Sequence, residues 1–351
     1  MIWLTWRQFR AQAIAVSAAL AAFAILLLAT GPHLVTLARQ SGFGTCHGNC
    51  ATTAGMFLNT LGTTVPYHTV YILGAALIIV LPAVIGLFWG APLIARELES
   101  GSFRLAWNQS VTRERWLAVK LGVLGLTSMA LAGLLSLALG WWASPIDHAA
   151  GIGSAGGFES RFFPVLFGAR GITPIGYAAF AFTLGVLVGL MVRRTVPAMA
   201  ITLAIFAVVQ IAMPLWIRPH LITPVRSTAA LTASTIQGLE TNPGGTQILN
   251  VFAAAPSLPG AWIYSNQATT ASGSTTLGAM PQACQLGPGG PKGGGFQACA
   301  SALAQMNLKQ VVTYQPAERY WAFQWLELGI FLTVAILLAW ACFWWVRRRL
   351  C

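Results

Sequence analysis

The sequence predicts an all-α membrane protein with six transmembrane helices, and three observations lead to that fold class. Of its 351 residues, 56% are hydrophobic and only 8% are charged, and the mean hydropathy is +0.68. Soluble domains carry about a quarter charged residues, which excludes a soluble globular fold. Six apolar runs are long enough to cross the hydrocarbon, which takes about 20 helical residues. Lys and Arg, finally, gather in the short segments between the runs.

The six runs contain no Asp, Glu, Lys or Arg, and we call them spans one to six in chain order. They lie at about 11–31, 71–94, 121–142, 172–192, 196–217 and 328–346. The three long connections between them are 32–70, 143–171 and 218–327. Spans two and five contain Pro82, Pro92 and Pro214. Such prolines are tolerated where neighbouring helices satisfy the freed carbonyls, so we expect kinks, with a gating hinge as the alternative. All six spans form one transmembrane domain over residues 1–351.

The distribution of positive charge predicts the orientation in the membrane. The two terminal tails, the loop after span two and the link between spans four and five hold 12 of the 20 Lys and Arg residues. The rest are diluted over the three long connections, so we expect both termini to be cytoplasmic in the plasma membrane and the long connections to be extracellular. Because the positive residues alternate with apolar runs, anionic lipid is the expected partner and nucleic acid is not.

The first ten residues, MIWLTWRQFR, combine spaced apolar and aromatic side chains with Arg7 and Arg10. This pattern predicts a short interfacial helix before span one. A cleaved signal peptide is the alternative, but no small-residue cleavage site follows LLLATGP.

The longest loop, 218–327, carries two notable segments. The glycine and proline residues of 286–295 cannot hold a helix. Segment 248–264 is apolar but short and broken by proline, which favours a re-entrant segment in the outer leaflet, provided other protein covers its backbone.

Four of the six cysteines lie in expected outer loops, where thiols oxidise: Cys46, Cys50, Cys284 and Cys299. An even number suggests two disulfides. We expect the local pairs Cys46–Cys50 and Cys284–Cys299, and a cross-link between the first and last loops is the alternative. The CHGNC element with His68 could also be read as zinc ligands, but no second ligand pair has a recognisable spacing, and no metal is expected.

Motifs for catalysis do not occur. The chain has no G-x-x-x-x-G-K-S/T loop, no H-E-x-x-H and no G-x-S-x-G, so we expect no enzymatic activity and no nucleotide bound to this chain. Only eight carboxylates are present. Glu327, at the outer mouth of span six, is expected to pair with Arg319 or another outer arginine.

The most charged stretch is 95–122, ARELESGSFRLAWNQSVTRERWLAVKLG, on the predicted cytoplasmic side. Thr112 can cap a helix that starts near Arg113. Phe103 and its apolar neighbours admit two interpretations that the residues alone leave open. One is an amphipathic hairpin lying on lipid, and the other is a docking surface for a cytosolic partner.

This stretch resembles the signature region between spans two and three of permease subunits of ABC transporters of the type-2 exporter class. The matching residues are Ala95-Arg96-Glu97, Glu99, Gly101-Ser102, Gln109, Val111-Thr112-Arg113, Arg115-Trp116 and Lys120. Segment 189–203, GLMVRRTVPAMAITL, is also similar to the turn between spans four and five of such permeases in high-GC Gram-positive bacteria. The expected layout of six spans with a large loop before the last matches this class over essentially the whole chain.

The resemblance implies an exporter that works by alternating access. Two permeases, as a homodimer or with a related permease, would sit on two copies of a cytosolic ABC ATPase, which would bind ATP and Mg²⁺. A coupling helix after span two would dock in the ATPase through Glu97, Glu99, Gly101, Phe103, Arg113 and Arg115. Spans two and five would line the cargo path, with Phe88, Phe206, Gln210 and Met213 as its candidate residues. An apolar path favours efflux of a drug, antibiotic, lipid or peptide.

Two other classes stay open on the sequence. One is a non-transporting membrane sensor or assembly protein whose extracellular loops bind a ligand. The other is an ion-driven carrier or channel, against which the lack of charges within the spans counts.

Overall fold

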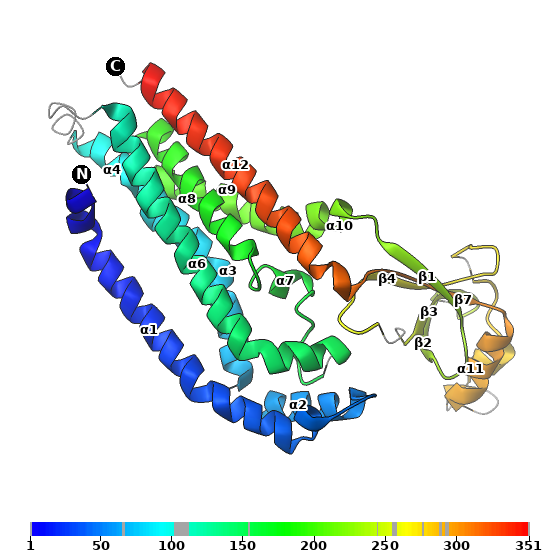
Figure 1. The fold of residues 1–351 in the computed structure, drawn as a ribbon. Coiled ribbons are helices and arrows are strands. Elements are labelled where there is room, and N and C mark those ends of the chain that lie inside the picture. Colours follow the sequence, from blue (N-terminus) through cyan, green and yellow to red (C-terminus); the bar gives the residue numbers. More distant parts are fainter. Residues whose placement is uncertain are drawn as a thin grey trace. The chain divides into compact units, whose positions relative to one another are not determined.

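The computed structural model divides the chain into two compact units. Unit 1, the helical unit, contains residues Met1–Ile222 and Tyr320–Cys351, and unit 2, the insert unit, contains Thr223–Arg319 (Figure 1). The structure describes residues 2–64, 67–101, 112–153, 155–243, 245–254, 258–275, 277–287, 290–291 and 295–349.

Six helical segments are long and apolar enough to cross a membrane, as the sequence predicts. All lie in unit 1, except that the sixth begins three residues before it. Within the described residues they are Ala18–Gln40, Tyr67–Glu99, Arg113–Ile152, Thr173–Val192, Thr195–Leu221 and Ala317–Arg348. Each overlaps one predicted span. Several of these helices are longer than the predicted apolar run. Their backbone hydrogen bonds continue into the flanking polar residues, where the hydrophobic pattern has already ended.

Helix α1, Ile2–Gln40, is continuous, so the segment predicted as an interfacial helix is helical and runs into span one without a break. The expected outer loop 32–70 is also largely helical. The Cys46–Cys50 disulfide precedes α2, Ala51–Thr63, and confirms the local pairing. Helix α2 buries Ala54, Phe57, Leu58 and Leu61 at helical spacing, against α6 and α3.

Span two consists of α3, Tyr67–Ile85, a π-helical turn, Gly86–Gly90, and α4, Ala91–Ser100. Span five is built in the same way from α9, Thr195–Ala212, a π-helical turn, Met213–Ile217, and α10, Arg218–Leu221. Pro92 and Pro214 lie within or next to these turns. Because proline lacks the N–H that continues an α-helix, a locally wider turn accommodates it. The prolines therefore mark irregular turns, and both spans continue beyond them.

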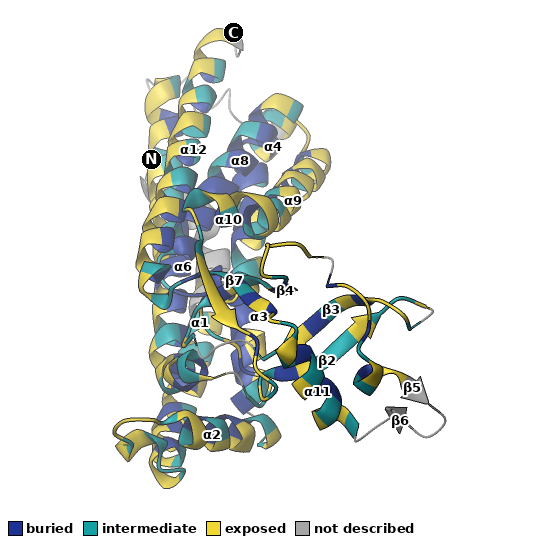
Figure 2. Ribbon diagram, turned by 90° about the vertical axis from the view of Figure 1, so that its right-hand side faces the viewer, coloured by how far each residue is buried: buried dark blue, intermediate teal, exposed yellow. Residues whose placement is uncertain are grey.

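Helix α8, Thr173–Val192, is the centre of the helical unit. It packs against α3, α4, α6, α9, α12 and the first π-helical turn. More than three quarters of the most apolar stretch of α8 is buried, compared with less than half for each of the other candidate spans. Figure 2 shows the exposed residues on the surrounding helices. Helix α6, Arg113–Ile152, and helix α12, Tyr320–Arg349, flank it. The short helix α7, Pro164–Phe167, precedes it.

Small residues allow α8 to approach span two very closely. A Cβ atom added at Gly185 would lie 2.5 Å from the Gly86 carbonyl oxygen and 2.7 Å from the Ala91 nitrogen. One added at Gly189 would lie 2.5 Å from the Ala91 carbonyl oxygen, and one at Gly90 would lie 2.6 Å from the Phe182 carbonyl oxygen. We call Gly86, Gly90, Gly185 and Gly189 the glycine seam. Such small-residue contacts are typical of packing between membrane helices, where backbones must come close to gain dispersion contacts.

The insert unit makes the all-α prediction wrong for residues 223–319. Strands β1, Val225–Ala230, β7, Lys309–Gln315, and β4, Trp262–Thr269, form an antiparallel sheet in the order β1-β7-β4. Strands β2, Ile236–Thr241, and β3, Ile248–Ala253, form a hairpin, and a short pair joins β5, Leu286–Gly287, to β6, Gly290–Pro291. Helix α11, Gly295–Gln305, follows.

The apolar stretch 248–264, expected as a re-entrant segment, instead contributes its described ends to strands β3 and β4. Its hydrophobic residues serve the core of the insert unit, in which Ile248 and Val251 pack with Leu303 and Leu308. The Cys284–Cys299 disulfide lies in the same core and confirms the second local pair.

Candidate functional site

The predicted coupling segment lies at the end of the helical unit where α4 ends, α6 begins and α12 ends. We call this the terminal end, since helix α1 begins and helix α12 ends on this side of the helical unit (Figure 1). Helix α4 ends at Gly101, whose φ of 71° is in the left-handed region that glycine adopts easily. Thr112 caps α6, as the sequence predicts, since its side-chain oxygen accepts a hydrogen bond from the Arg115 N–H at 3.3 Å. Residues 102–111, including Phe103, lie outside the described residues.

Glu97 is joined to Lys120 of α6 by an ion pair. The Lys120 Nζ donates to Glu97 Oε1, and the two side chains are only 6% and 18% exposed. Lys120 also lies 4.6 Å from the centre of the Trp116 ring. The charge of Glu97 is thus compensated within the chain, and its role in docking to the ATPase stays a prediction. The pair ties α4 to α6.

Glu99 joins α4 to span five. Its Oε2 accepts hydrogen bonds from the Thr195 N–H at 3.2 Å and from the Thr195 hydroxyl at 2.7 Å. Thr195 begins α9, and residue Arg194 at the cap position provides no side-chain cap of its own. A carboxylate at a helix N-terminus satisfies a free N–H and interacts favourably with the helix dipole. Span two thereby supplies the missing cap of span five.

A third link at this end joins α6 to α12. Arg347 Nε lies 2.7 Å from Glu114 Oε1, and its Nη2 donates to Oε2 at 3.0 Å. Both side chains are more than half exposed, so this link contributes less than the buried ones. Arg115 is exposed and Arg113 is half-buried. Sequence reasoning missed Lys120, Thr195 and Glu114 as partners because each contact joins residues far apart in the chain.

The four candidate path residues do not gather around one opening in the single chain. Phe206 and Met213 are buried, and the Phe206 ring lies 6.3 Å from that of Phe180 in helix packing. Phe88, in the first π-helical turn, is half exposed. Gln210 is half-buried, and its Oε1 has no hydrogen-bond partner among the described residues. Their role in a path between two permeases stays a prediction.

Away from the terminal end, span six carries a buried ion pair with span five. Arg218 donates from Nε to Glu327 Oε2 at 2.8 Å and from Nη2 to Oε1 at 3.0 Å, and both side chains are at most 1% exposed. Arg218 Nη1 donates to the Pro164 carbonyl at 2.8 Å, and the Tyr177 hydroxyl donates to Glu327. The expectation of an arginine partner for Glu327 is confirmed, with Arg218 as that partner. Arg319 instead donates to the Thr223 and Gln315 oxygens.

A second polar cluster organises the approach to α8. Gln324 Oε1 accepts from the N–H groups of Ile172 and Thr173 and from the Thr173 hydroxyl, and its Nε2 donates to the Phe167 and Arg170 carbonyls. Arg170 Nε lies 3.2 Å from Asp147 Oδ2, and both residues are largely buried. The described residues therefore include buried charges, all of them in ion pairs. A lack of buried charge can no longer be used as an argument against an ion-driven carrier.

The described groups that could ligate a metal do not form a site. No cluster of three His, Cys, Asp or Glu residues occurs among the described residues. Cys46 and Cys50 are joined to each other, so they are not available as zinc ligands in this structure.

Six helices long and apolar enough to cross a membrane fit a multi-pass membrane protein. A comparison with protein families agrees, since the model described as ABC-2 membrane transporter related matches residues 17–218, more than half of the chain. The chain belongs to this family, which confirms the resemblance to an ABC-2 type permease. The match runs from within span one to the end of predicted span five and stops before the insert unit. No curated protein and no solved structure matches the chain.

Proposed function

We propose that this protein is the membrane-spanning subunit of an ATP-driven exporter. Two copies of the chain, or one with a related permease, sit on two cytosolic ABC ATPase subunits, which bind ATP and Mg²⁺. The terminal end faces the cytoplasm, and an amphipathic or hydrophobic cargo leaves between the two permeases by alternating access. The family match supports the permease role, since ABC-2 permeases generally work with an ATPase partner.

One observation carries the coupling part of the proposal: α4 is fastened to three other spans. Glu97 ties it to α6, Glu99 ties it to α9, and the glycine seam holds its first residues against α8. Residues 102–111 join α4 to α6. A force applied to that segment by an ATPase would therefore be transmitted to spans two, three, four and five together, which is what alternating access requires of a coupling element.

The test is association and stimulation of an ATPase encoded beside this gene, with both proteins purified together in nanodiscs. We expect Phe103→Ala to weaken association by at least tenfold and to weaken it more than Glu99→Ala does, because buried apolar anchors dominate interfaces. Phe163→Ala is the matched control. Phe163 is half exposed, precedes α7 and lies away from the terminal end. Equal association of the wild type and every variant at 97–104 would contradict the coupling role.

The insert unit favours one alternative, a sensor or assembly protein that does not transport. It has a separate hydrophobic core and its own disulfide, as a ligand-binding module would. The same purification distinguishes the two functions. If the protein is a sensor, no compound tested should stimulate the ATPase activity. If it is an exporter, its cargo should stimulate that activity.

A further inference from the structure

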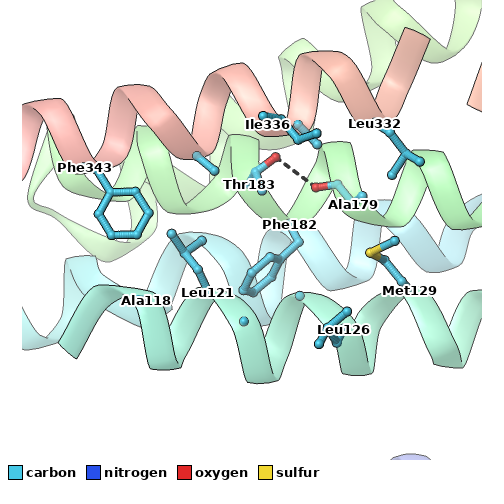
Figure 3. Close-up of a pocket in the computed structure, with 14 residues that line it drawn as sticks. Ala118, Leu121, Leu126, Met129, Ala179, Phe182, Thr183, Leu332, Ile336 and Phe343 are labelled. Carbon is cyan, nitrogen blue, oxygen red and sulfur yellow. Dashed lines mark hydrogen bonds between the residues drawn. The ribbon is translucent and has the colours of Figure 1, made fainter. Parts of the chain in front are cut away.

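An apolar groove runs along the outside of the helical unit, and none of the candidate path residues lines it. Its volume is about 460 Å³, and Figure 3 shows it between α6 and α12 with α8 as its floor. We call it the α6–α12 groove. Its lining is Ala118, Leu121, Gly122, Gly125, Leu126, Met129, Ala179, Phe182, Thr183, Leu332, Ala335, Ile336, Ala339 and Phe343.

The lining offers nothing to a polar ligand. Thr183 carries the one polar side chain among these residues, and its hydroxyl already donates to the Ala179 carbonyl at 2.9 Å. Leu126 and Ile336, each about two thirds exposed at 67% and 68%, border the groove, so it is open to the surroundings along one side. In a membrane, those surroundings are acyl chains.

The length of the groove matches one leaflet. On α6 it extends from Ala118 to Met129, and on α12 from Leu332 to Phe343. Eleven residue steps at 1.5 Å each give about 16.5 Å along each helix. Half of a hydrocarbon core of about 30 Å is about 15 Å. Because Ala118 and Phe343 are its ends nearest the terminal end, the groove lies in the leaflet on that side.

The volume of the groove favours an acyl chain over a transmembrane helix as the occupant. A helix segment about 16.5 Å long and about 10 Å in diameter occupies about 1,300 Å³, well above the groove volume of about 460 Å³. A helix with its side chains is about 10–12 Å wide. A helix of a second copy could insert side chains but could not fill the groove, whereas a single acyl chain is narrow enough to lie along it.

Positive charge surrounds the end of the groove. Glu114 and Arg347, one helical turn beyond Ala118 and Phe343 on the same helix faces, bridge α6 and α12 there. Arg115 is exposed beside Glu114, and the exposed Arg348 lies 5.3 Å from the Trp344 ring centre. These three arginines and one carboxylate give a net charge of +2, which complements a phosphate headgroup.

From this geometry we infer that the α6–α12 groove binds one acyl chain of an anionic phospholipid, with the headgroup beside Arg347 and Arg348. The site is separate from the proposed cargo path, because α8 stands between them: Phe182 floors the groove, while its carbonyl meets Gly90 on the other side. The lipid fills the space between α6 and α12 and supports their packing on α8.

The test uses the full chain in nanodiscs with phosphatidylglycerol that carries a diazirine in the middle of one acyl chain. Irradiation and peptide mapping should concentrate adducts on 118–129 and 332–343. Gly122→Leu should reduce these adducts at least fivefold, because no atom lies within 4 Å of a Cβ added there and the new side chain can occupy the groove. Gly140→Leu is the matched control, since it makes the same change on the same helix with equally open space and should leave the adducts unchanged.

Ala339→Leu repeats the test from α12, so that a folding defect of one variant does not decide the outcome. Adducts within twofold of wild type in both filled variants would overturn the proposal. So would cross-links from Ala118 or Phe343 to a second copy of the chain, which would place protein there instead of lipid.

The headgroup is tested with phosphatidylcholine that carries the same diazirine. We expect at least a threefold preference for phosphatidylglycerol at low salt, reduced by Arg348→Gln and by 0.5 M salt, since exposed charges are screened. Equal labelling by both lipids would overturn the anionic part of the inference. No ATPase is present in these assays and no transport is measured, so their failure would leave the permease proposal standing.

Discussion

Two arginine–glutamate pairs in this protein have the same chemistry but different surroundings. Arg218 and Glu327 are fully buried and share Tyr177 and the Pro164 carbonyl as further partners. Arg347 and Glu114 have equally good geometry but are 62% and 51% exposed. Removing one member of a buried pair leaves an uncompensated charge in a medium of low dielectric constant, whereas water solvates the remaining partner of an exposed pair.

We therefore predict that Glu327→Leu lowers the free energy of unfolding by about 3–5 kcal/mol. Glu114→Leu, the control, should lower it by no more than about 1 kcal/mol. The double variant Arg218→Met with Glu327→Leu should be more stable than Glu327→Leu alone, because it leaves no unpaired charge. Thermal unfolding in detergent, followed by tryptophan fluorescence, measures all three. Similar losses in Glu327→Leu and Glu114→Leu would contradict the difference in burial.

Glu97 allows the internal role to be separated from a role in the interface. Glu97→Arg should destabilise the chain more than Glu97→Ala, since it places a second cation beside the buried Lys120. Combining Glu97→Lys with Lys120→Glu restores the pair with its charges exchanged. If the pair acts within the chain, this exchange should recover most of the melting temperature and ATPase stimulation. An exchange variant that melts normally but does not bind the ATPase would instead indicate that Glu97 contacts the partner directly.

At the scale of elements, backbone contact holds spans two and four together. The glycine seam brings α8 against the π-helical turn and the start of α4, where no side chain fits. Interfaces of this kind resist expansion because the atoms that must yield belong to backbone rather than to flexible side chains. The turn itself lies between α3 and α4, so the seam also fixes the irregular part of span two.

We predict that Gly185→Ala destabilises the protein by about 1–3 kcal/mol and reduces ATPase stimulation. Its Cβ would lie 2.5 Å from the Gly86 carbonyl oxygen and 2.7 Å from the Ala91 nitrogen, so the helices must separate. Gly140→Ala, on α6, meets no atom within 4 Å and should be neutral or slightly stabilising through its helix propensity. Equal melting temperatures for the two variants would show that the seam can relax without cost.

At the scale of the whole molecule, the orientation across the membrane determines which surfaces can meet an ATPase. The bias of Lys and Arg toward the short segments predicts that the terminal end is cytoplasmic. Single cysteines at Arg115 and Arg348 should then react with an impermeant maleimide only after cells are opened. A cysteine at Ser272, in an exposed turn of the insert unit, should react in intact cells. Labelling of Arg115→Cys from outside would reverse the orientation and remove the coupling role of 95–122.

How much the sequence predicts depends on whether a feature is set by neighbouring residues. The local disulfides, the cap at Thr112 and the presence of six spans were all predicted correctly, because each depends on nearby residues or on one long apolar run. Segment 223–319 was read as a loop because its strands are short and lack strict alternation. Segment 248–264 was misread as re-entrant because a short apolar run has the same composition whether it forms a core strand or enters the membrane.

By itself, the sequence determined that this chain crosses a membrane and that it has the signature of an ABC-2 permease. Apolar length and a local motif require no knowledge of which residues meet. Only the tertiary structure decided that Glu97 meets Lys120, that Glu99 caps α9 and that Arg218 is the partner of Glu327. It likewise decided that α6 and α12 leave a groove over α8. Each of these features joins residues separated by 23 positions or more, and their pairing follows from how the helices pack rather than from any local pattern.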